Sequence, residues 1–201
     1  EYEKCHISSR SYPFVVASLQ KIDPLRVKSV ACSGATTEDV IGDNSIYKGQ
    51  SNRLSKMGLI DTDSTISQTQ AILNYIPGRI LQNSFVEKYN PKVITIGIGG
   101  NDAGLMGKLR LCIGPGTCDV ASTDIGKEQA AAEIKNLYGT LVKTYQELHM
   151  TSPNSKIYAI GYPKIINIST ECDLINGFLL DKTERQFMNE GIIYLNQVIK
   201  A

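Results

Sequence analysis

Short runs of β-branched apolar residues predict three buried strands. They occupy residues 27–32, a segment that begins at Val93, and residues 156–160. Continuous apolar runs of this length are typical of strands in a parallel sheet, because helices cover both faces of such a sheet.

Apolar residues recur at three- and four-residue spacing in four further segments: 14–22, 67–87, 125–150 and 182–200. This spacing places them on one face of a helix, which the core then buries. The expected core positions are Phe14, Val15, Ala17, Ser18 and Leu19; Ile134, Leu137, Tyr138, Leu141, Tyr145 and Leu148; and Phe187, Ile192, Leu195, Val198 and Ile199.

Local signals refine these helices. Pro77-Gly78 is expected to kink or split the segment 67–87, and Asn90-Pro91 to end it. Thr36 or Thr37 is expected to cap a further short helix.

The order helix, strand, helix, strand, helix, strand, helix predicts an α/β fold with a parallel sheet. We expect three layers, with a flavodoxin-like parallel sheet between helices on both faces, and a single domain over residues 1–201. The segments 42–67 and 103–126 are expected to be long loops that shape a pocket.

Composition narrows the classes of function. The 201 residues carry a formal net charge of +1, which gives no electrostatic argument for nucleic acid or for an anionic membrane. No apolar run approaches the roughly 20 residues of a membrane-spanning helix. The two histidines and the lack of any CxxC pair give no zinc site.

The five cysteines are candidates for disulfides. Cys112 and Cys118 bracket a turn-rich loop, and Cys5 and Cys32 precede and end the first strand unit. Two such bridges would leave Cys172 without a partner in the chain. Disulfides indicate a secreted, oxidising context; the alternative is five reduced, partly buried thiols in a cytoplasmic protein.

The segment that begins at Val93 carries the strongest chemical signal, because it ends in Gly99-Gly100-Asn101-Asp102. Glycines let the backbone turn sharply and let a ligand approach closely. Ligands of open parallel sheets bind outside the carboxyl ends of the strands, where an Asn amide can donate to a developing oxyanion. A dinucleotide-binding loop is the alternative, but the spacing of its glycines and its acidic residue are missing.

Four segments in order support a more specific interpretation. They are Cys5-His6 with Ser11-Tyr12-Pro13, Ala31-Cys32-Ser33-Gly34-Ala35-Thr36, Gly99-Gly100-Asn101-Asp102, and Gly161-Tyr162-Pro163. Together they resemble the SGNH (GDSL-type) hydrolases over nearly the whole chain, and within them the secreted, disulfide-bearing lipase and esterase branch of actinomycetes. This resemblance implies an SGNH hydrolase-like α/β fold.

The resemblance implies roles for individual residues. Gly34 matches the glycine whose backbone N–H binds the oxyanion, and Asn101 matches the asparagine whose side-chain amide does so. We further expect Ser33, Gly100 and Tyr162 at the substrate pocket; Tyr162 follows the carboxyl end of a strand, where a plain turn is the alternative.

Two blocks of the SGNH pattern are absent from the sequence: the Gly-Asp-Ser segment with the nucleophile and the Asp-x-x-His segment with the base. By the resemblance, they would lie upstream of Cys5 and downstream of Ala201. We therefore expect the domain to be incomplete at both ends and to lack its first, central strand. The neighbouring strands would then have an unpaired edge, at a cost of about 1–3 kcal/mol for each buried unpaired group. Cys172 resembles a cysteine whose partner follows the catalytic His.

The histidines within the chain are weaker candidates for a catalytic base. No spacing links His6 or His149 to Ser8, Ser9 or Ser33. His149 lies near the expected C-terminus of a helix, where the helix dipole favours a cation. Asp102 is expected to order its loop or cap the next segment.

The sequence thus predicts a serine-type hydrolase of carboxylic esters, lipase- or esterase-like, in which this chain supplies the oxyanion-hole half of the site. The substrate would be a small-molecule, lipid or carbohydrate ester, and the chemistry needs no metal or organic cofactor. The nucleophile and base would come from a missing segment of the same protein. The alternative is a non-catalytic SGNH-like module that binds a ligand in the same pocket.

Overall fold

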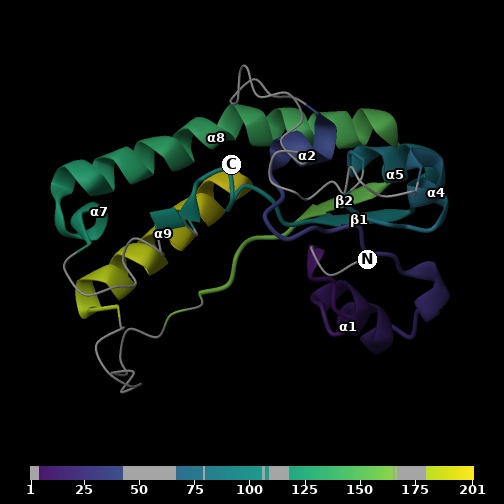
Figure 1. The fold of residues 1–201 in the computed structure, drawn as a ribbon, viewed down its shortest axis with the longest axis horizontal. Helices are drawn as coiled ribbons and strands as arrows, with labels where there is room; N and C mark the ends of the chain where they lie inside the picture. The colour runs from purple at the N-terminus through teal and green to yellow at the C-terminus, as the bar shows by residue number, and fades with distance from the viewer. Residues whose placement is uncertain are drawn as a thin grey trace. The chain divides into compact units, whose positions relative to one another are not determined.

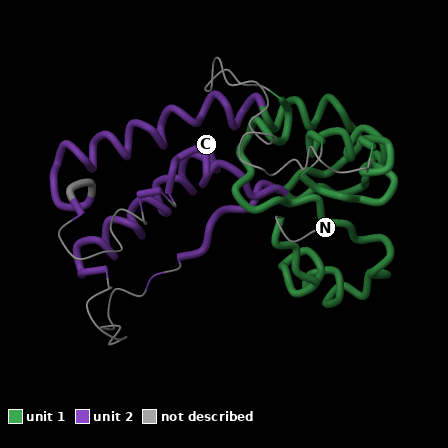
Figure 2. Tube along the Cα trace, viewed as in Figure 1, with its two compact units in different colours: residues 1–95, 144–158 green, residues 96–143, 159–201 purple. Residues whose placement is uncertain are grey.

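The computed structural model describes residues 5–42, 67–78, 80–105, 107–108, 118–164, 166 and 180–201. These residues form several short helices, a small sheet and two long helices (Figure 1). They divide into two compact units: a first unit of residues 1–95 and 144–158, and a second unit of residues 96–143 and 159–201 (Figure 2). Three predicted features lie wholly or mostly outside the described residues: the loop 42–67, Cys112 and Cys172. The predicted loop 103–126 is described in part, and its last third is wrong as a loop, because Asp119–Ser122 and the residues from Asp124 onward are helical.

The first unit begins with α1 (Tyr12–Leu19) and the 3-10 turn η2 (Pro24–Arg26). The Tyr12 hydroxyl donates to Thr95 Oγ1 at 3.0 Å, which ties the start of α1 to the sheet. The predicted burial of α1 is wrong, because Val15 and Leu19 are 46% and 75% exposed and only Ala17 is buried. Apolar residues lie all around this two-turn helix rather than in one stripe, so only one of its sides is covered.

The predicted cap of the next helix is confirmed. Helix α2 (Thr37–Ile41) follows Thr36, whose N–H and hydroxyl donate to Asp39 Oδ2 at 2.7 and 3.0 Å. The Asp39 N–H in turn donates to the Thr36 carbonyl at 3.0 Å. Both residues are buried, so this pairing satisfies backbone groups that water does not reach.

The predicted division of the segment 67–87 is also confirmed. It forms α4 (Gln68–Leu73) and α5 (Asn83–Tyr89), with Pro77-Gly78 between them. Ser67 caps α4, and α5 ends at Asn90, whose φ of 41° is the left-handed conformation that asparagine tolerates.

The sheet of the described residues has two strands, β1 (Val93–Ile96) and β2 (Lys156–Ala159). The Lys156 N–H donates to the Lys92 carbonyl at 3.0 Å and the Ile160 N–H to the Ile96 carbonyl at 2.8 Å, so the strands run parallel in a constant register. At their amino ends, the Ser152 and Ser155 hydroxyls bond to each other and to the segment Asn90-Pro91.

The predicted strand at 27–32 is wrong, since these residues have no regular structure. A strand needs a partner for its backbone groups, and the described residues supply none here. The groups bond elsewhere instead: the Val30 carbonyl accepts from Gln82 Nε2 at 3.0 Å. A disulfide joins Cys32 to Cys5, which confirms one of the two predicted bridges.

The second unit contains α7 (Asp119–Ser122), most of α8 (Asp124–Thr151) and α9 (Lys182–Lys200). The predicted bounds of α9 are confirmed, and Asp181 caps it by accepting from the Glu184 N–H at 2.8 Å. A core of small and apolar side chains joins the three helices: Cys118, Ala121, Ala130, Phe187 and Met188. Cys118 is itself disulfide-bonded.

Most predicted core positions of α8 and α9 are buried, including Leu141 and Leu195. Tyr138 is an exception at 47% exposure. It lies one residue beyond Leu137, and the turn of about 100° per residue carries it out of the buried stripe. None of the helices in the described segments has the length and apolar character needed to cross a bilayer.

Candidate functional site

The carboxyl end of β1 leads into a closed loop that carries Asn101. Gly99 turns the chain with a φ of 108°, and a Cβ added there would lie 3.4 Å from Leu141 Cδ2. The Ala103 N–H donates to the Gly99 carbonyl at 2.9 Å, and the Gly104 N–H to the Asn101 carbonyl at 3.0 Å. Gly99 and Gly100 are buried in this loop, and Asn101 is half-buried.

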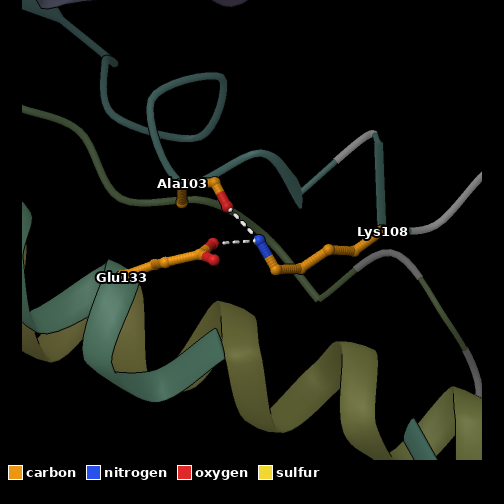
Figure 3. A network of polar contacts seen from close by, with 3 residues as sticks. All are labelled: Ala103, Lys108 and Glu133. Atoms are coloured by element: carbon orange, nitrogen blue, oxygen red, sulfur yellow. Dashed lines mark hydrogen bonds and ion pairs between the residues drawn. The ribbon is translucent and has the colours of Figure 1, made fainter. Parts of the chain in front are cut away.

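A lysine holds this loop after Asn101, at Ala103. Lys108 Nζ donates to the Ala103 carbonyl at 2.8 Å and pairs with Glu133 of α8 at 2.5 Å (Figure 3). The lysine is largely buried whereas Glu133 is mostly exposed. The ammonium therefore connects the loop directly to α8.

A tyrosine holds the same loop before Asn101, at Gly100. The Gly100 N–H donates to the Tyr162 hydroxyl at 3.0 Å, so the structure brings together two of the residues predicted at the pocket. Tyr162 is held in turn by Asn196 of α9, whose Oδ1 accepts from the Tyr162 N–H at 2.7 Å and whose Nδ2 donates to the Tyr162 carbonyl at 2.8 Å.

The environment of Tyr162 favours the neutral form of its phenol. Burial raises its pKa above the ordinary value of 10.0; the hydrogen bond from Gly100 lowers it, and the negative charge of Asp102 raises it further. At neutral pH the hydroxyl thus accepts from the loop without placing a negative charge beside Asn101.

Gly34 and Ser33 belong to the first unit, whereas the loop that carries Asn101 belongs to the second. Gly34 has a φ of 81°, in a turn closed by the bond from the Ala35 N–H to the Cys32 carbonyl at 3.1 Å. The Ser33 N–H donates to the Cys5 carbonyl at 3.1 Å, and the Cys5–Cys32 disulfide adds a covalent anchor to this turn. The left-handed conformation at Gly34 explains why a glycine is needed there.

The histidines lie on the surface of the first unit. His6 is exposed in an irregular segment, and His149 is exposed in the last turn of α8, as predicted for a residue that favours a helix C-terminus.

Sequence reasoning missed three residues that build the loop: Asn196, Lys108 and Glu133. A signal existed for Asn196, which lies four residues after Ile192 and three before Ile199 and so borders the apolar face of α9, where a polar side chain needs a partner. The pair of Lys108 and Glu133 is 25 residues apart and has no local signal.

Comparisons with known proteins agree with this architecture. No family model matches the chain. Lipase 1 of Streptomyces coelicolor is 25% identical over 195 residues, which cover 97% of this chain and 55% of that protein. The chain therefore spans about half the length of the curated relative that it matches.

Two crystal structures are similar in fold. The extracellular lipase from Streptomyces rimosus has a TM-score of 0.62, with 98% of this chain and 64% of that chain covered at 21% identity. Phospholipase A1 from Streptomyces albidoflavus NA297 has a TM-score of 0.60 at 21% identity, and the match covers 99% of this chain and 64% of that chain. The chain thus has the α/β fold of these Streptomyces lipases, as the resemblance to SGNH hydrolases implied.

Proposed function

We propose that this chain provides the oxyanion-binding part of a serine-type hydrolase of carboxylic esters. The observation that carries the proposal is the loop after β1, which holds Asn101 at the carboxyl end of a parallel strand through contacts on both of its sides. The likeness to lipases in sequence and in fold supports it.

In the proposed reaction a serine hydroxyl attacks the ester carbonyl, and negative charge develops on the carbonyl oxygen. The Asn101 side-chain amide and the Gly34 backbone N–H donate hydrogen bonds to that oxygen. One such donor lowers the barrier by roughly 3–4 kcal/mol, because it is aimed before the charge forms. The alcohol leaves, and water then hydrolyses the acyl-enzyme.

We propose that the serine and the histidine come from parts of the protein outside these 201 residues. Two observations support this: no Gly-Asp-Ser or Asp-x-x-His block of the expected placement occurs, and the chain spans 55% of the curated relative's length. The substrate class proposed is a lipid or carbohydrate ester. The Cys5–Cys32 disulfide supports a secreted protein.

A fluorophosphonate probe, which labels activated serines, tests the proposal. We expect it to label the product of the complete reading frame that contains these residues and to leave residues 1–201 expressed alone unlabelled. Labelling of residues 1–201 alone would show that the nucleophile lies within them.

The same experiment addresses a second candidate, a non-catalytic binding module of this fold. The absence of a recognisable nucleophile block favours that candidate. If the complete protein binds no probe and hydrolyses no p-nitrophenyl ester, the hydrolase proposal is wrong and the binding module stands.

A further inference from the structure

A continuous series of contacts runs from α9 to the loop of Asn101. It begins at Asn196, whose side-chain amide bonds to both backbone polar groups of Tyr162, at 2.7 and 2.8 Å. Two bonds to one peptide segment fix its orientation, as a neighbouring strand would. They therefore set the direction in which the Tyr162 side chain leaves the backbone.

Close packing at both ends of this series depends on glycine. A Cβ added at Gly161 would lie 2.7 Å from Asn196 Oδ1, and one added at Gly100 would lie 3.0 Å from the Tyr162 hydroxyl oxygen. Neither distance leaves room for a side chain without movement of a partner. The approach of Asn196 to Tyr162 and of Tyr162 to Gly100 thus requires these residue types.

The last contact restrains the backbone immediately before Asn101. The Gly100 N–H donates to the Tyr162 hydroxyl at 3.0 Å, and the Gly100 carbonyl accepts from the Leu105 N–H at 3.1 Å. The Asn101 carbonyl is held by the Gly104 N–H at 3.0 Å. Of these three hydrogen bonds, two lie within the backbone of the loop and one comes from the Tyr162 side chain. Removal of the Tyr162 hydroxyl would eliminate this third bond.

From these contacts we infer that Tyr162 is a positioning residue for Asn101 and that Asn196 holds Tyr162 in place; the inference rests on the oxyanion role proposed for Asn101. An oxyanion donor works because it is aimed before the reaction, and a displacement of about 1 Å costs up to 10²-fold in rate. Tyr162 acts through the loop backbone and is assigned no contact with the substrate.

A double-mutant cycle in the complete protein tests this role, with Asn101→Ala, Tyr162→Phe and their combination. Tyr162→Phe is expected to lower kcat about 5- to 10-fold, the effect of one hydrogen bond, and to change KM less than about twofold. In the Asn101→Ala background it is expected to have no further effect, because its target is gone. The same decrease in both backgrounds would overturn the inference.

Tyr138→Phe is the matched control, since Tyr138 is an exposed tyrosine of the same unit. It is expected to leave kcat unchanged. If Tyr162→Phe does not fold, Asn196→Asp replaces it: the aspartate keeps the acceptor for the Tyr162 N–H and loses the donor to the Tyr162 carbonyl. The same pattern of kcat loss, absent in the Asn101→Ala background, is expected.

Amide hydrogen exchange in the complete protein separates this inference from the proposed function. Tyr162→Phe is expected to accelerate exchange at Gly100 about tenfold and to leave the Ile160 amide of the sheet unchanged. Unchanged exchange at Gly100 would overturn the inference. If Asn101→Ala leaves the rate of the complete protein unchanged, the oxyanion role is wrong, whereas accelerated exchange still establishes the contact of Tyr162 with the loop.

Discussion

Asn101 illustrates what a motif predicts for a single residue and what it leaves out. Its place after a β-branched run and two glycines predicted a polar side chain at the end of a strand, and it follows β1 as expected. Of the side chains that hold its loop, Lys108 is near in the sequence, whereas Glu133, Tyr162 and Asn196 are far away. No pattern in the sequence around Asn101 encodes these partners.

The proposed role of Asn101 predicts a specific loss of rate. Asn101→Ala should lower kcat/KM of the complete protein by about 10²–10³-fold, because one oxyanion donor is removed. Asn101→Asp should be at least as slow, since a carboxylate only accepts hydrogen bonds and repels the oxyanion. Steady-state kinetics on a p-nitrophenyl ester measure both, and an active Asn101→Asp enzyme would contradict the role.

Tyr162 predicts a pH dependence of stability. Its pKa in the folded chain is raised above the ordinary 10.0, chiefly by burial. The folded state therefore favours the neutral phenol; this contribution is complete below about pH 10 and is lost as the pH rises through the higher pKa of the folded state. Urea unfolding between pH 8 and 11 should show a decrease in the free energy of unfolding that is smaller in Tyr162→Phe. Equal decreases would argue against the raised pKa.

The helices and strands differ in how well the sequence predicts them, because their signals differ in range. The starts of α4 and α9 follow Ser67 and Asp181, whose capping bonds reach only three residues ahead. Residues 27–32 have the composition of a strand, but a strand needs a distant partner. Among the described residues, the Val30 carbonyl accepts from Gln82 and the Cys32 carbonyl from the Ala35 N–H instead. Local signals are thus sufficient to predict where a helix begins, but not whether a strand finds a partner to pair with.

A pair of glycines in the second unit predicts opposite effects of the same substitution. Gly161→Ala should lower the free energy of unfolding by about 1–3 kcal/mol, because the added Cβ would lie 2.7 Å from Asn196 Oδ1. Gly139→Ala should raise it by about 0.5–1 kcal/mol, because Gly139 lies in α8 with nothing within 4 Å of an added Cβ. Urea unfolding measures both, and a stabilising Gly161→Ala would show that Asn196 does not hold this segment.

At the scale of the whole molecule, the described residues divide into two compact units. Gly34 belongs to the first unit and Asn101 to the second, whereas α8 and both strands run from one unit into the other. The alternation of elements predicted the α/β class and the parallel register, and the comparison with Streptomyces lipases confirms the fold. The division into units follows from packing between distant segments, which the sequence pattern does not contain.

The Cys5–Cys32 disulfide should contribute substantially to the stability of the first unit. It closes a segment with a sequence separation of 27. Loss of this restraint on the unfolded chain costs about 3–4 kcal/mol in the chain-entropy account. The double variant Cys5→Ala, Cys32→Ala should therefore unfold at a lower urea midpoint. An unchanged midpoint would show that the disulfide is absent in solution.

The contact between Tyr162 and Gly100 also makes the site visible to spectroscopy. The chain contains no tryptophan and 10 tyrosines, so its near-ultraviolet signal comes mainly from tyrosine rings. Tyr162 is a largely buried ring with fixed neighbours, and a ring in an asymmetric, rigid setting contributes strongly to near-ultraviolet circular dichroism. The difference spectrum between the natural chain and Tyr162→Phe thus isolates an intrinsic optical signal that follows the state of the loop, without an added label.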